Sequence, residues 1–209
     1  NLVPTAYANT IFITLMGTVI SMLLTCASAF VLSRKELPGR RLMTLFVVFT
    51  MLFNAGLVPF YLLVRDVGLL NTRWSLILPF AVSTYNTIIM RNFFQGVSNA
   101  LYEAASIDGC GIYGCFFRIA LPLCRTGFFV SGLMTFVGNW NELLLAMVFV
   151  SDPVKKTLPV TLTYFVGPYA TNYVQMFAAI IIAIAPTVIV YCLFSNQIVE
   201  GLTTGAVKG

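Results

Sequence analysis

The stretch at residues 98–111 reads SNALYEAASIDGCG, and the interpretation of the whole chain starts from it. It is the only long segment outside the strongly apolar runs that still has the pattern of a helix. Ser98 or Asn99 can cap its start, and Gly109 supplies the left-handed residue that ends it. Its apolar side, at helical spacing, consists of Leu101, Ala104, Ala105 and Ile107. The pattern predicts a docking helix on the cytoplasmic side of a membrane.

Two features of this helix are better explained by contact with another protein than by the stability of the helix itself. Asp108 lies in the last turn, where a carboxylate faces the negative end of the helix dipole at a cost of about 0.3 to 1 kcal/mol. Ala104 and Ala105 are small, and small side chains let a second backbone approach closely.

The composition excludes a soluble globular domain. Of 209 residues, 59% are hydrophobic, 9% are charged and none is histidine, whereas about a quarter of the residues of a soluble domain are charged. The net charge of +5 is a weak argument for nucleic-acid binding, because the basic residues lie in short clusters between apolar runs. We therefore predict an all-α, polytopic transmembrane helical bundle that forms one domain over residues 1–209.

Five apolar runs are long enough to cross a bilayer. Arg34, Lys35, Arg40 and Arg41 follow the first run, and such a basic loop indicates the cytoplasmic side. The chain therefore starts outside and ends inside, which fits a six-span protein that has lost its first span; Asn1 in place of Met agrees with this. The predicted spans are residues 11–32, 42–63, 74–94, 128–150 and 176–194, and the cytoplasmic segment is residues 98–122.

The five cysteines lie in or near the spans or on the predicted cytoplasmic side, and no two of them form a Cys-x-x-Cys pair. We interpret them as small apolar fillers in a reducing compartment. They are Cys26, Cys110, Cys115, Cys124 and Cys192.

Polar residues inside the predicted spans are the candidates for a translocation pathway. Asn139, Asn141 and Glu142 flank Trp140 about halfway along the fourth span, and Asn86 lies at a similar depth in the third. A carboxylate near the bilayer centre costs at least a few kcal/mol unless it is protonated, paired or facing water. These residues either line a pathway or form hydrogen bonds that hold the bundle together.

The string Glu103-Ala104-Ala105-x-x-Asp108-Gly109, followed by Leu121-Pro122, resembles the EAA loop of the membrane subunits of binding-protein-dependent ABC importers. Other segments resemble the carbohydrate-uptake branch, in particular the second permease of the maltose transporter. Two positions depart from the family pattern, which usually has Pro at Ser98 or Asn99 and Ala at Cys110. The segments that resemble this branch are Asn9-Thr10, Gly68 to Thr72, Trp140-Asn141-Glu142 and Gly201 to Gly209.

The resemblance implies a coupling helix that docks on an ATPase. The residues it assigns to this contact are Glu103, Ala104, Ala105, Asp108 and Gly109, although Asp108 and Gly109 are equally well explained as the turn that ends the helix. The implied partners are a homologous second permease, two ATP-binding subunits, an extracellular solute-binding protein and membrane lipid, but no nucleic acid. ATP and Mg belong to the partner subunits, so we expect no cofactor and no catalysis in this chain.

The last outer loop contains Tyr164, Phe165, Gly167 and Tyr169. Its aromatic residues are typical of an interfacial belt, whereas the resemblance implies a loop that reaches toward the solute-binding protein.

The leading hypothesis is a permease subunit of an ATP-driven importer for a sugar or oligosaccharide, in a bacterial or archaeal inner membrane. The alternatives are an ABC importer permease for another solute, such as a polyamine or phosphonate, and a secondary transporter or channel that works alone.

Overall fold

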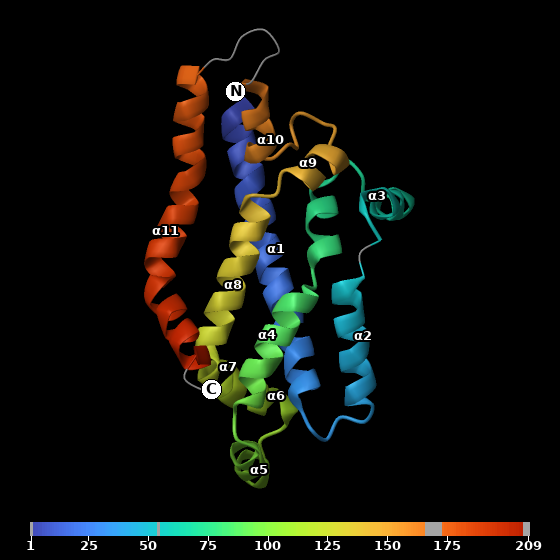
Figure 1. Ribbon diagram of the computed structural model, residues 1–209, viewed down its shortest axis with the longest axis vertical. Helices are drawn as coiled ribbons and strands as arrows, with labels where there is room; N and C mark the ends of the chain where they lie inside the picture. Colours follow the sequence, from blue (N-terminus) through green and yellow to red (C-terminus); the bar gives the residue numbers. More distant parts are fainter. Residues whose placement is uncertain (1, 54, 166–172, 207–209) are drawn as a thin grey trace. The chain divides into compact units, whose positions relative to one another are not determined.

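The computed structural model describes residues 2–53, 55–165 and 173–206, and their regular structure is entirely helical (Figure 1). The predicted all-α class is confirmed. The longer helices are α1 (Leu2–Ser33), α2 (Arg40–Leu52), α3 (Leu57–Asp66), α4 (Thr84–Gln95), α5 (Asn99–Ile107), α8 (Arg125–Trp140) and α11 (Tyr173–Ala206). The shorter ones are α6 (Ile112–Gly114), α7 (Leu121–Leu123), α9 (Leu144–Phe149) and α10 (Leu158–Leu162), a π-helical segment (Cys115–Ala120), and the 3₁₀ turns η1 (Arg73–Leu76), η2 (Leu78–Phe80) and η4 (Thr163–Phe165).

By length and composition, the described residues contain two helices that can each cross a membrane, α1 and Met176–Ser195 within α11. The number rises to four if each of two bent pairs counts as one span: α2 with α3, and Ile112–Leu123 with α8. The first helix begins nine residues before the predicted start of span one, at Leu2. The described residues therefore contain two to four candidate spans by this measure, and the count of five stays a prediction.

Three of the predicted spans are interrupted. Residues 74–94 form η1, η2 and then α4, because Pro79 has no N–H to donate and Ser83 caps a new helix through a bond from the Asn86 N–H to its Oγ (3.2 Å). Residues 128–150 break between Trp140 and Leu144. Residues 42–63 break between α2 and α3, where Gly56 has a φ of 89°.

The chain divides into two units, and we describe each by itself. Unit one comprises Asn1–Ile20, Ala55–Ala81 and Leu133–Phe194; unit two comprises Ser21–Asn54, Val82–Gly132 and Ser195–Gly209.

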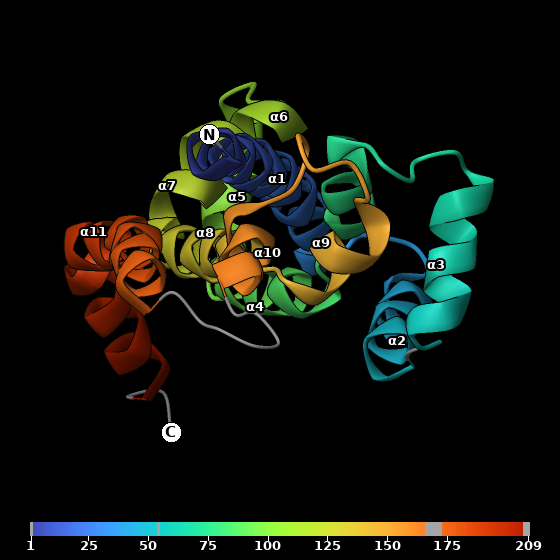
Figure 2. The same cartoon turned by 90° about the horizontal axis from the view of Figure 1, so that it is seen from above.

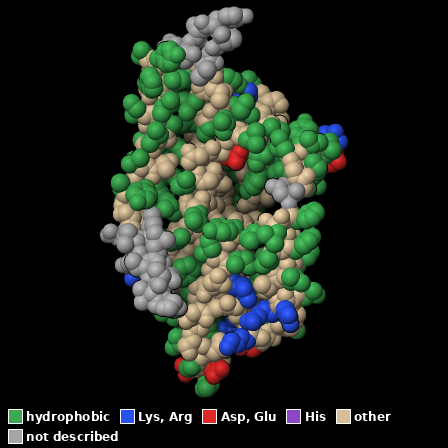
Figure 3. Space-filling view, in the orientation of Figure 1, with side chains coloured by type: hydrophobic (Ala, Val, Ile, Leu, Met, Phe, Trp, Pro, Cys, Tyr) green, Lys and Arg blue, Asp and Glu red, His purple; other side chains and the backbone are tan. Residues whose placement is uncertain are grey.

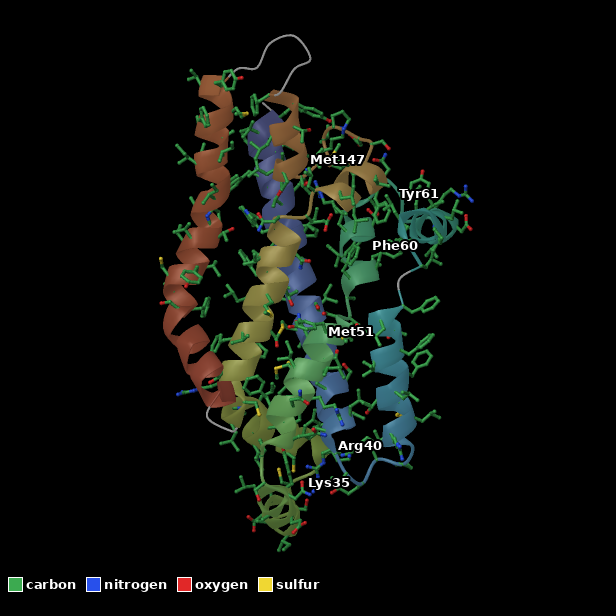
Figure 4. All side chains as sticks on the ribbon, viewed as in Figure 1. Lys35, Arg40, Met51, Phe60, Tyr61 and Met147 are labelled. Atoms are coloured by element: carbon green, nitrogen blue, oxygen red, sulfur yellow. The ribbon has the colours of Figure 1, made fainter. Side chains whose placement is uncertain are left out.

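The core of unit one is built around Phe149, which is 1% exposed. Its ring lies 5.6 Å from that of Phe60 and 6.4 Å from that of Tyr61, both on α3 (Figure 4). Figures 1 and 2 both place α9, which carries Phe149, beside α3. These contacts make α3 part of the folded core of unit one.

The core of unit two is built around Phe30, near the end of α1. Its ring contacts the rings of Phe94, Tyr102 and Phe116 at 5.8, 6.1 and 5.1 Å. Cys26, Cys115 and Cys124 are buried in the same cluster, which agrees with their interpretation as apolar fillers.

The buried side of α1 carries small and hydroxyl side chains, which permit close packing. In unit one a Cβ added at Gly17 would lie 2.9 Å from Nδ2 of Asn139, so a larger residue there would displace that amide. The buried small residues of α1 are Ala6, Thr10, Thr14, Ser21, Thr25 and Ala29.

Candidate functional site

The end of α5 has the geometry that the sequence predicts. Gly109 has a φ of 80°, the Cys110 N–H donates to the Ala105 carbonyl at 2.8 Å, and the Gly109 N–H donates to the Ser106 carbonyl at 3.1 Å. This pair of bonds is a Schellman cap, and it accounts for Gly109 without a partner protein. At the other end, Ser98 is the N-cap residue but its side chain makes no capping bond, so side-chain capping of α5 is not seen.

Tyr102 anchors α5 to the rest of unit two. It is 3% exposed, and the Arg34 guanidinium lies over its ring, 4.1 Å from the centroid. Its ring also packs edge-on against Phe30. Two residues of the predicted apolar side, Leu101 and Ile107, are 48% and 87% exposed, so this side is not buried within the described chain. The large aromatic ring of Tyr102 can remove much apolar area from water when it is buried. This single large ring in a short helix was the sequence signal for the anchor, and it was missed.

The exposed side of α5 carries the residues of the EAA pattern. Glu103 and Asp108 are exposed, and neither forms an ion pair with any residue that the structure describes. Ile107 lies one turn after Glu103 and therefore on the same side. Ala104 is exposed and Ala105 half-buried. The helix thus presents a carboxylate, a small side chain and a large apolar side chain together.

Asn141 and Glu142 lie in the break between α8 and α9, not in the middle of a helix. The Leu145 N–H donates to Oε1 of Glu142 at 2.8 Å, so the carboxylate caps the first turn of α9. Nδ2 of Asn141 donates to the Val137 carbonyl at 2.9 Å. These bonds explain why the predicted fourth span is interrupted here.

The structure brings Asn139 and Glu142 to one cavity of unit one and places Asn141 on another. The first cavity has a volume of about 220 Å³. The second, of about 480 Å³, lies against α11, where the Trp140 indole donates to the Ala183 carbonyl at 2.9 Å. Asn86 belongs to unit two, where it is buried in the first turn of α4. The first cavity is lined by Ile13, Leu76, Phe80, Gly138, Asn139, Glu142 and Thr157.

Asn9 and Thr10 hold the segment before α10 against α1. Nδ2 of Asn9 donates to the carbonyls of Val154 (2.7 Å) and Lys156 (3.1 Å), and its Oδ1 accepts from Nε of Arg73 (3.0 Å). Oγ1 of Thr10 accepts from the Leu158 N–H at 2.7 Å. Both residues are almost fully buried. The sequence singled out this pair only through the family resemblance, and its structural role was missed.

Asn71 makes a second tie to the same segment. Its backbone is left-handed, with a φ of 58°. Its N–H donates to the Phe149 carbonyl (2.8 Å), its Oδ1 accepts from the Asp152 N–H (2.9 Å), and its carbonyl accepts from Nζ of Lys155 (3.0 Å). The backbone and the side chain of Asn71 therefore join the loop after α3 to the loop after α9.

Of the four aromatic-loop residues, Tyr164 and Phe165 form η4, while Gly167 and Tyr169 lie outside the described residues. Tyr164 is half exposed. The Lys156 amine contacts its hydroxyl and lies 5.0 Å from its ring centroid. Tyr164 thus contacts Lys156, whose carbonyl accepts a hydrogen bond from Asn9 of α1.

Comparison with known proteins identifies the class. Residues 17–200 match the family described as binding-protein-dependent transport system inner membrane component, and the chain belongs to this family. It is similar to the polygalacturonan/rhamnogalacturonan transport system permease YtcP of Bacillus subtilis, with 36% identity over 95% of this chain and 75% of the relative. It is also similar to the sulfoquinovosyl glycerol transport system permease SmoH of Agrobacterium fabrum, with 34% identity over 96% of this chain and 72% of the relative.

A solved structure agrees with this assignment. It is the crystal structure of a bacterial ABC transporter involved in the import of the acidic polysaccharide alginate. The match has a TM-score of 0.88 and 32% identity, and it covers 95% of this chain and 76% of that chain. The chain is thus an inner-membrane component of a binding-protein-dependent transport system.

The Asn9 contacts lead to a prediction about the loop that precedes α10. Asn9→Ala leaves two carbonyls and the Arg73 guanidinium without their partner, at a cost of about 1 to 3 kcal/mol. We expect the loop to open more often, so that trypsin cleaves after Lys155 and Lys156 several-fold faster, measured by mass spectrometry of timed digests. Thr10→Ser keeps the hydroxyl that Leu158 requires and serves as the control. Equal cleavage of Asn9→Ala and the natural protein would contradict this role.

Proposed function

We propose that the chain is a permease subunit of an ATP-driven ABC importer for a sugar or oligosaccharide, and that it forms half of the translocation pathway. The observation that carries the proposal is the match over 95% of the chain to a transporter involved in alginate import. Relatives named for polygalacturonan or rhamnogalacturonan and for sulfoquinovosyl glycerol support a carbohydrate or carbohydrate-containing solute.

The proposed assembly contains a second, homologous permease, two ATP-binding subunits and an extracellular solute-binding protein. ATP and Mg bind the partner subunits, and this chain holds no cofactor. The proposed topology keeps the five-span order, starting outside and ending inside, with the interrupted segments 42–63, 74–94 and 128–150 crossing as broken spans. Broken helices are tolerated at membrane depth where they are buried in protein or line a water-filled cavity.

Coupling to ATP hydrolysis is proposed to run through α5. In this mechanism Glu103, Ala104, Ala105, Asp108 and Gly109 meet the ATP-binding subunit. The Schellman cap and the Tyr102 anchor support it, because they hold α5 as one rigid piece against the end of α1. A push on the exposed side of α5 would then reach α1 through Phe30 and Arg34, and so bias an inward- or outward-facing state.

Asn139 and Glu142 are proposed to line the pathway, and Asn141 and Asn86 to belong to it. The shared cavity supports the first pair. The Glu142 cap on α9 and the contact of Asn139 with Gly17 are also structural roles, and for Glu142 the pathway role is tested separately below.

The aromatic loop is proposed to face the solute-binding protein, through Tyr164, Phe165, Gly167 and Tyr169. The exposure of Tyr164 and its fixation by Lys156 support this role for the described part of the loop.

The coupling role predicts a specific defect for Glu103→Lys. A partly desolvated charge pair loses about 2 to 5 kcal/mol when one member is removed, so ATPase co-purification and uptake should be lost while the protein still inserts in the membrane. Glu103→Ala should be weaker in the same direction. Tyr102→Phe should be mild, because its buried hydroxyl has no hydrogen-bond partner in the described structure.

The matched control is Asp66→Lys, which reverses another exposed carboxylate whose partner, Arg65, belongs to this chain. It should leave ATPase co-purification unchanged. Normal uptake by Glu103→Lys with the ATPase still bound would show that the coupling assignment is wrong.

The pathway role of Glu142 can be separated from its capping role by two substitutions. Glu142→Ala removes both the charge and the bond to the Leu145 N–H, whereas Glu142→Gln keeps an acceptor oxygen and removes only the charge. If the charge lines the route, both variants lose uptake while the complex still assembles and hydrolyses ATP. Normal uptake by Glu142→Gln, with a defect only in Glu142→Ala, would assign the residue to helix capping.

A further inference from the structure

Unit two contains a basic cavity that neither the pathway nor the ATPase contact explains. Its volume is about 250 Å³, and it lies where the end of α1, the start of α2, the end of α4 and the start of α5 meet. We call it the basic pocket. Its lining residues are Ser33, Arg34, Lys35, Arg40, Phe94, Gln95, Val97, Asn99 and Tyr102.

The lining of the basic pocket carries three cationic side chains and no carboxylate. These cations are Arg34, Lys35 and Arg40. Among the described residues, Arg34 pairs with the carboxylate of Glu36, which lies 3.6 Å from its Nε and is largely exposed. Figure 4 labels Lys35 and Arg40 at the loop between α1 and α2, and Figure 3 shows Lys and Arg side chains gathered over that part of unit two. Three cations facing one small cavity repel one another unless an anion joins them.

Arg34 also has unused hydrogen-bonding capacity. Its Nη1 is buried and has no hydrogen-bond partner among the residues that the structure describes. A buried donor without a partner costs about 1 to 3 kcal/mol. The guanidinium lies against the Tyr102 ring, and Arg34 lines the pocket, so the side chain that carries this unpaired donor is within the site.

We propose that the basic pocket binds the phosphate of an anionic phospholipid head group. A guanidinium fork and lysine amines are the side chains that recognise phosphate. The pocket directly follows α1, which is apolar and long enough to cross the bilayer, so its charges lie at head-group level. Basic pockets beside membrane helices on the cytoplasmic side bind such head groups.

The bound head group would also touch the coupling helix, a consequence that rests on the proposed function. Asn99 and Tyr102 belong to α5, whereas Arg34 and Lys35 lie in the connection between α1 and α2, and Arg40 is the first residue of α2. A phosphate between them draws the cations toward α5. Anionic lipid therefore stabilises the seating of α5 on unit two, and membrane composition tunes the coupling.

The test measures lipid binding by the full chain. Fluorescent phosphatidylglycerol is titrated into the purified protein in neutral detergent, with phosphatidylcholine as the uncharged counterpart and inorganic phosphate as competitor. Each basic residue near a membrane surface contributes about fivefold in affinity, so Arg34→Gln with Arg40→Gln should weaken phosphatidylglycerol binding by about 25-fold. Lys35→Gln, at an exposed side chain that the fold does not require, should weaken it by about fivefold.

The control is Arg65→Gln, which removes the same charge from an exposed site on α3 and should leave binding unchanged. The proposal is overturned if the pocket variants bind phosphatidylglycerol as the natural protein does, or if phosphatidylcholine binds equally well. Displacement by inorganic phosphate as strong as by phosphatidylglycerol would assign the site to free phosphate. Unchanged lipid binding with lost ATPase co-purification would assign it to a protein partner.

Glu103→Lys separates this proposal from the coupling proposal. Glu103 does not line the basic pocket, so its reversal should leave phosphatidylglycerol binding unchanged even where ATPase binding is lost. If lipid binding depends on the pocket residues but Glu103→Lys still binds the ATPase, the lipid site is supported and the coupling role of α5 is not.

Discussion

The contact of the Tyr102 ring with Phe30 and Arg34 is the one on which the rest of unit two depends. It joins a nine-residue helix to the end of a membrane-length helix. A helix of that length has little stability of its own in water. The anchor therefore turns α5 into a fixed part of the fold, and it leaves Glu103 and Ile107 on the side that faces outward. The same contact sets the position of Arg34 at the basic pocket.

In unit one, hydrogen bonds from polar side chains hold the loops in place. Asn9 and Asn71 each join segments far apart in sequence through several hydrogen bonds. Glu142 caps α9 within the same unit. These bonds matter because a buried polar group without a partner costs about 1 to 3 kcal/mol. Polar residues in an apolar chain of this family thus serve architecture as well as any role in transport.

Local signals were enough to predict some features from the sequence. The end of α5 at Gly109 follows from the backbone freedom of one residue, and the membrane class follows from composition. The helix breaks within 74–94 and 128–150 were not predicted, because average hydropathy does not register the effects of Pro79, Ser83 and the Glu142 cap. The Tyr102 anchor depends on residues about 70 positions away in sequence, as its ring contact with Phe30 shows, so the periodicity of α5 alone did not reveal it.

The accessibility of Ile107 tests the central claim most directly. Its side chain is 87% exposed on the chain alone and lies beside Glu103. In a background with Cys110 and Cys192 replaced by serine, the rate of alkylation of an Ile107→Cys variant is measured with and without the ATP-binding subunits. The account predicts fast alkylation of the permease alone and strong protection in the complex. Equal rates in both states would show that α5 does not dock on the ATPase.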